Sequence, residues 1–107
     1  MSLDVYLEDA DGNCFYTANI THNLNKMADS AGIYCCLWRP EENGITHAKQ
    51  VIEPLSRGVA LLASEKSRFE KFNDENGCGT WENFLTFCAD YLQACRDNPG
   101  ALVRSFR

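Results

Sequence analysis

The first twenty residues constrain the fold most, because their pattern predicts a β-hairpin. Leu3, Val5 and Leu7 alternate with more polar residues, which is the period of a strand with one buried face. "DADGN" then supplies turn residues, and "CFYTANI" resumes an aromatic and β-branched run. A two-stranded hairpin is only marginally stable in water, so the rest of the chain must cover it or add a strand.

A first helix is predicted directly after the hairpin, over residues 22–31. The second strand should end near Asn19, and Thr21 is a good N-cap before apolar residues that recur at three- and four-residue spacing. "GIYCCLWRPEENG" follows, and predicts one or two helical turns and a loop that presents Trp38 and Arg39.

Two longer helices are predicted from apolar stripes. The first begins near Thr46 and contains Pro54, which should kink the helix or divide it in two. A short helix is expected in "SEKSRFEKF". The second long helix covers residues 81–96, with Thr80 as its N-cap and Pro99 and Gly100 after its end.

The tail "ALVRSFR" alternates as a third strand would, and we expect it to pair with the hairpin. With 107 residues, the chain is long enough for one domain with its own core. The sequence therefore predicts a single α+β domain over residues 1–107. Its small antiparallel sheet, the N-terminal hairpin plus the C-terminal strand, is covered on one face by about four helices.

Charge and cysteine content limit the environment and the partners. Fifteen acidic against ten basic residues give a net charge of -5, which disfavours non-specific binding to nucleic acid and to anionic membranes. The start of the chain has neither a basic region nor an apolar run, so we expect a cytoplasmic protein in a host bacterial cytosol, with no membrane association. In that reducing compartment all six cysteines should be free.

The cysteine pattern predicts no metal site and no cofactor. There is no Cys-x-x-Cys pair, and the two histidines are far apart. Cys88 and Cys95 lie on the apolar face of a predicted helix and are expected in the core. Cys78 lies between two glycines before a helix, where a thiol pKa could be lowered.

One candidate ligand site lies where the second strand meets the first helix. Thr21, His22 and Asn23 precede helical amides that have no intrahelical partner, and such amides favour an anion. The alternative is that Thr21 caps the helix, that Asn19 and Asn23 satisfy local backbone groups, and that His22 is exposed without a role.

Two further segments could complete this site. "LWRPEE" offers Trp38, Arg39 and Glu41, and the glycine loop "GCGTWE" opens a helix with Gly77, Gly79, Thr80 and Trp81. A stacking aromatic, an arginine and two helix N-termini would together suit a nucleotide-like anion, although the P-loop lysine and spacing are absent. The alternative for both tryptophans is packing in the core.

The whole chain resembles a family of small bacteriophage and prophage proteins without an established activity. The resemblance rests on "LDVYLE", "ANITHNLNKMA", "AGIY", "LWRPEENG", "GTWE" and "YLQAC", and it covers nearly the full length. It implies a phage or mobile-element context, and it transfers no functional residue.

The leading hypothesis is a phage accessory protein that binds a host protein or a small anionic ligand. Such binding could act against a host defence system. The alternative is a small enzyme that acts on a nucleotide-like substrate, with His22 as base and Glu41 or Glu42 as acid. No nucleophile other than Cys78 supports it, so a non-enzymatic protein is favoured. A second alternative is a homo-oligomeric structural component of a virion. In the binding hypothesis, His22→Ala and Arg39→Ala should abolish binding and leave the melting temperature unchanged.

Overall fold

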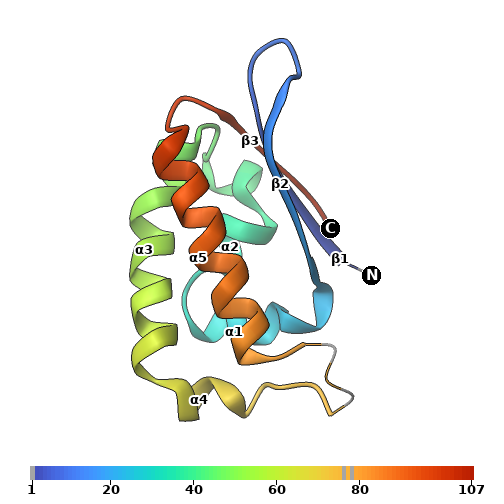
Figure 1. The fold of residues 1–107 in the computed structure, drawn as a ribbon, viewed down its shortest axis with the longest axis vertical. Helices are drawn as coiled ribbons and strands as arrows, with labels where there is room; N and C mark the ends of the chain where they lie inside the picture. The colour runs from blue at the N-terminus through green and yellow to red at the C-terminus, as the bar shows by residue number, and fades with distance from the viewer. Residues whose placement is uncertain (1, 76, 78) are drawn as a thin grey trace.

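A three-stranded antiparallel sheet forms one layer of the molecule, and the helices form the other (Figure 1). The computed structural model describes residues 2–75, 77 and 79–107. The strands are β1 (Ser2–Glu8), β2 (Cys14–Thr21) and β3 (Leu102–Phe106), in the order β2-β1-β3. The predicted α+β class, with a hairpin and a C-terminal strand in one sheet, is confirmed.

The central strand β1 sets which face of the sheet is buried. Leu3 pairs with Ile20, and Val5 pairs with Ala18 on one side and Ser105 on the other. Leu3, Val5 and Leu7 have no exposed surface, whereas the residues between them are partly exposed. Helices therefore cover one face only, as the alternation predicts.

In the described part of the chain, five α-helices and two short 3-10 helices lie between β2 and β3. Strand β2 continues to Thr21, two residues beyond the expected end, because Thr21 still pairs with Ser2. The predicted helix over 22–31 is a 3-10 turn followed by a short α-helix. The elements are η1 (His22–Leu24), α1 (Asn25–Ser30), α2 (Tyr34–Trp38), η2 (Pro40–Asn43), α3 (Ala48–Ser64), α4 (Lys66–Glu70) and α5 (Trp81–Asp97).

Helix α3 does not divide at Pro54, so that part of the prediction is wrong. The helix is continuous over 17 residues with the proline inside it. Val51 and Leu55, on either side of Pro54, are fully buried, and α3 packs along α5. Tertiary packing of this apolar face outweighs the lost backbone hydrogen bond.

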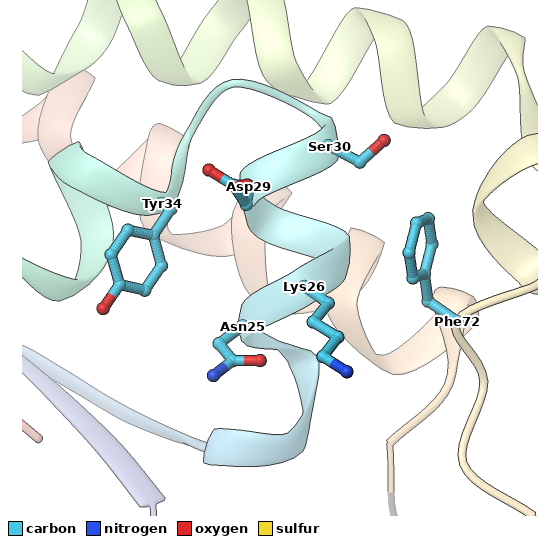
Figure 2. Close-up of a pocket in the computed structure, with 6 residues that line it drawn as sticks. All are labelled: Asn25, Lys26, Asp29, Ser30, Tyr34 and Phe72. Atoms are coloured by element: carbon cyan, nitrogen blue, oxygen red, sulfur yellow. The ribbon is translucent and has the colours of Figure 1, made fainter.

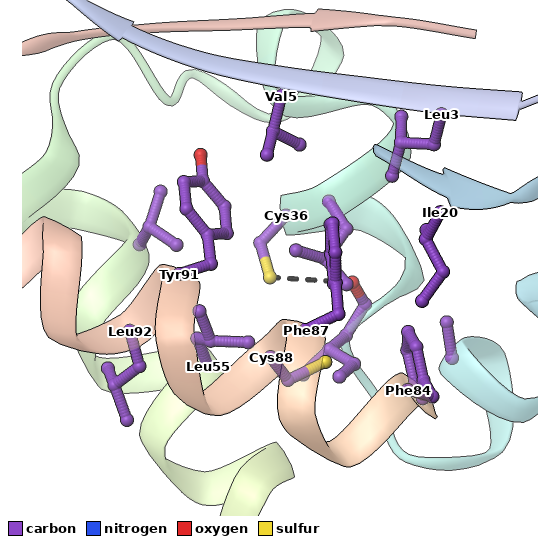
Figure 3. Packing of buried hydrophobic residues seen from close by; sticks show 14 of the residues in the cluster. Leu3, Val5, Ile20, Cys36, Leu55, Phe84, Phe87, Cys88, Tyr91 and Leu92 are labelled. Atoms are coloured by element: carbon purple, nitrogen blue, oxygen red, sulfur yellow. Dashed lines mark hydrogen bonds between the residues drawn. The ribbon is translucent and has the colours of Figure 1, made fainter. Parts of the chain in front are cut away.

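The core lies between the sheet and the pair α3 and α5 (Figure 3). Cys88 and Cys95 are fully buried on α5, as predicted, and Cys36 joins them from α2. Cys14 and Cys35 are exposed, and these five thiols are all free. Cys78 lies outside the described residues. None of the helices in the described part of the chain has the length and apolar character of a membrane span.

Candidate functional site

The amides expected to attract an anion are occupied by the protein itself. At the start of η1, the Asn23 amide donates to Thr21 Oγ1 over 3.4 Å. At the start of α5, the amides of Asn83 and Trp81 donate to Thr80 Oγ1 over 3.2 Å and to Asn73 Oδ1 over 2.7 Å. Thr21 and Thr80 therefore act as caps, and these first-turn donors are not open to a ligand.

Trp38 is a core residue that is bonded to His22. Its side chain has no exposed surface, its ring stacks on Tyr34 with centroids 5.5 Å apart, and its indole Nε1 donates to His22 Nδ1 over 3.2 Å. The side-chain amide nitrogen of Asn25 lies 3.3 Å from the other ring nitrogen of His22. A fully buried indole cannot stack on a ligand, so Trp38 has a structural role.

Arg39 and Glu41 belong to an ion-pair network that includes Glu42 and the C-terminal Arg107. Arg39 Nη1 lies 2.6 Å from Glu42, and Arg107 Nη1 lies 2.7 Å from Glu41. Hydrogen bonds to the Tyr34 hydroxyl and to Glu42 raise the pKa of Arg39, and the hydrogen bond from Arg107 lowers the pKa of Glu41. Glu41 lines a separate hollow of about 280 Å³ beside β3, away from His22.

The glycine loop before α5 packs against the strand-to-helix junction. Gly79 is buried, and a Cβ there would lie 3.2 Å from Thr21 Cγ2. Gly77 has a φ of 78°, which an L side chain rarely adopts. Trp81 donates its indole N–H to the Leu62 carbonyl over 2.8 Å, and Lys66 Nζ lies 5.1 Å from its ring centroid. This indole therefore faces α3 and α4.

The concave surface lies beside these residues, over α1. Two adjacent hollows, of about 550 Å³ and 340 Å³, share the lining residues Asn25, Lys26 and Phe72. Figure 2 shows Tyr34 and Phe72 on opposite sides of α1, with the side chains of Asn25 and Lys26 between them. We call this surface the α1 groove; it is lined by His22, Asn23, Asn25, Lys26, Asp29, Ser30, Tyr34, Phe72, Asn73 and Asp74.

Hydrogen bonds from distant segments hold the groove in shape. Asn23 Nδ2 donates to Asp74 Oδ2 over 2.6 Å, and Arg68 Nη2 donates to the Ser30 carbonyl over 3.0 Å. Lys26 and Asp29 are exposed, and neither forms an ion pair within the described residues. Among the residues that the structure describes, the groove thus presents the amine of Lys26 and the carboxylate of Asp29 without ion-pair partners, between the aromatic side chains of Tyr34 and Phe72.

Two of the ten predicted site residues, His22 and Asn23, line this groove. Thr21 and Thr80 are capping residues, and Trp38 and Gly79 are buried. These four are not among the lining residues, and neither are Arg39, Glu41, Gly77 and Trp81. Lys26, Asp29 and Phe72 also line the groove, and they were not predicted as site residues from the sequence. The sequence contains a signal for each of them. Lys26 and Asp29 lie on the polar face of a predicted helix, and Phe72 is an aromatic residue among charged residues.

The imidazole of His22 is held by the fold where it borders the groove. Both ring nitrogens of His22 have polar neighbours, and no three His, Cys, Asp or Glu side chains of the described residues converge as metal ligands would. No family model, curated protein or solved structure matches the chain.

Proposed function

We propose that this protein is a non-enzymatic binding protein that holds a segment of a partner protein in the α1 groove. The observation that carries the proposal is the lining of the groove. Tyr34 and Phe72 offer apolar contact area, while Lys26 and Asp29 offer one charge of each sign. A polypeptide segment supplies the matching chemistry, because it carries apolar and charged side chains side by side.

A small anionic ligand is less well supported than a polypeptide. Two carboxylates, those of Asp29 and Asp74, and the one amine of Lys26 are the charged groups among the described lining residues, so the local charge does not favour a phosphate. The two hollows are open along the surface, whereas small-molecule pockets usually enclose most of their ligand. The nearby helix N-termini offer no free first-turn donors at the amides described above.

The resemblance to phage proteins supports a host protein as the partner and interference with a host defence as the role. The negative net charge fits a partner whose docking surface carries basic residues around an apolar centre. Within the groove, Asp29 would pair with such a basic residue, and Lys26 would pair with an acidic one.

A peptide selection tests this proposal. A random peptide library displayed on a carrier is selected against the wild-type protein and against the double variant Lys26→Glu, Asp29→Lys, which reverses the groove charges and keeps the net charge. The control variant is Lys49→Glu, an exposed position on α3 outside the groove. We expect the wild type and Lys49→Glu to enrich the same peptides and the reversed groove to lose them. Peptides that bind all three proteins equally would contradict the proposal.

A further inference from the structure

The two edges of the sheet differ in how they are covered. Along β3, the Val103 amide donates to the Thr46 carbonyl over 2.9 Å, and Leu102 forms a bridge with His47. Strand β2 is the other edge, and in the part of the chain that the structure describes its only backbone ladder is with β1. The outward backbone groups of β2 therefore remain available to another strand.

Strand β2 has one feature that usually keeps an edge from pairing, a shift of register at Phe15, which has no partner in β1. From Tyr16 to Thr21 the ladder is regular, and this part of the edge lacks the other common protections. Residues 12–25 contain no Asp, Glu, Lys, Arg or Pro. Phe15 is 52% exposed, and Thr17 and Asn19 are exposed on the same face of the sheet. Charged side chains and prolines are the common protection of an edge strand, so this edge is open to strand addition. The β1–β2 hairpin also extends past the ends of α3 and α5, which leaves its outer part uncovered by them (Figure 1).

We propose that β2 pairs antiparallel with β2 of a second copy of this chain, which joins two sheets into one of six strands. Two copies with a net charge of -5 each repel one another, so they can associate best through a surface without acidic residues. The uncharged edge of β2 is such a surface. A two-fold axis makes this contact self-complementary, as in most dimers.

The side-chain pattern favours one register. A two-fold axis perpendicular to the sheet puts both helix layers on the same side, and with Ala18 at the axis the helix-facing Tyr16 lies opposite Ile20 of the second copy. This is a pair of an aromatic with a β-branched residue, which stabilises antiparallel strands. The dimer contact is made by β2, and no residue of β2 lines the α1 groove. The dimer is therefore independent of the proposed function.

Sedimentation equilibrium over a concentration series tests the dimer. The wild type should fit a monomer–dimer equilibrium, and Thr17→Lys should weaken association by about tenfold or more, because it puts like charges along the shared edge. The control is Phe106→Lys, which places the same charge on the same sheet face at the other edge strand, where the side chain is 56% exposed. It should leave association unchanged.

Hydrogen exchange of the wild type gives a second measurement that does not depend on a variant folding. Amides along the outer edge of β2 should exchange more slowly as the protein concentration rises, while exposed amides of α4 should not change. A wild type that remains monomeric would overturn the proposal. A dimer that is lost in Phe106→Lys and kept in Thr17→Lys would also overturn it. The same holds if protection from hydrogen exchange rises with concentration outside β2 and not along it.

Discussion

The indole Nε1 of Trp38 donates a hydrogen bond to Nδ1 of His22 over 3.2 Å. Trp38 has no exposed surface, so this donor has no access to water and needs a partner inside the protein. His22 follows β2 directly and Trp38 ends α2, so the bond joins two segments on which the α1 groove is built. A histidine that looked like a ligand contact in the sequence is therefore also a structural residue.

Replacing His22 with alanine should destabilise the fold. The change leaves the Trp38 N–H buried without a partner, which costs about 1–3 kcal/mol of unfolding free energy. This replaces the expectation from sequence that His22→Ala has no effect on stability. Urea unfolding of His22→Ala, Trp38→Phe and the double variant measures the coupling. If the two single losses simply add, the hydrogen bond has no energetic role.

Much of the fold was predictable because it depends on local periodicity. The alternation of Leu3, Val5 and Leu7 indicated a strand with one buried face, and the stripe through Cys88 and Cys95 indicated the helix α5. Both patterns reflect burial directly. The sheet, its third strand and the covering helices could therefore be predicted from such patterns.

The site was less predictable because it depends on contacts between distant segments. Nothing near Asn23 in the sequence indicates that it bonds Asp74, 51 positions away, or that Phe72 lies across α1 from Tyr34. Trp38 and Arg39 carry groups that suit a ligand, yet the fold uses one in the core and the other in an ion pair. Residue chemistry alone does not distinguish these uses.

Gly58→Ala should destabilise the protein although alanine favours a helix. Gly58 is buried in α3, and a Cβ there would collide with Cγ2 of Ile33. Overpacking of this kind typically costs about 1–3 kcal/mol, and a clash this close should lie above the gain of about 1 kcal/mol in helix propensity. Thermal unfolding of Gly58→Ala alone and with Ile33→Ala checks the cause. If the clash is not the cause, Ile33→Ala will not reduce the loss of stability that Gly58→Ala produces.

Alkaline pH should weaken the fold through its buried thiols. Burial raises the pKa of Cys36 and of Cys95 from 9.0 to about 12. A raised pKa means that the folded state holds the thiol proton more tightly than the unfolded state does. The contribution of these thiols to the unfolding free energy is therefore complete below the unfolded pKa of 9.0 and is lost as the pH rises toward 12. Unfolding free energy measured against pH should fall less steeply in Cys95→Ala. The exposed Cys14→Ser serves as control and should follow the wild type.

Deleting residues 101–107 should abolish cooperative folding. The deletion removes β3, which pairs with β1 from Asp4 to Glu8, and the hydrogen bond from Arg107 Nη1 to the Trp38 carbonyl over 3.1 Å. Only the hairpin would remain as sheet, and a hairpin is marginal without a third strand. Calorimetry of the truncated chain tests this, and a melting transition unchanged from the full chain would show that β3 does not support the sheet. Arg107→Ala is the milder variant and should keep a cooperative transition.

Chemical-shift mapping of the groove tests the central proposal most directly. The ¹⁵N-labelled wild-type protein is titrated with a peptide selected on it, and the amide shifts are followed. We expect the largest shifts at Asn25, Lys26, Asp29, Tyr34 and Phe72, and an affinity about tenfold or more lower in the charge-reversed Lys26→Glu, Asp29→Lys variant than in Lys49→Glu. Largest shifts on another surface, or equal affinities in the two variants, would contradict a binding function for the α1 groove.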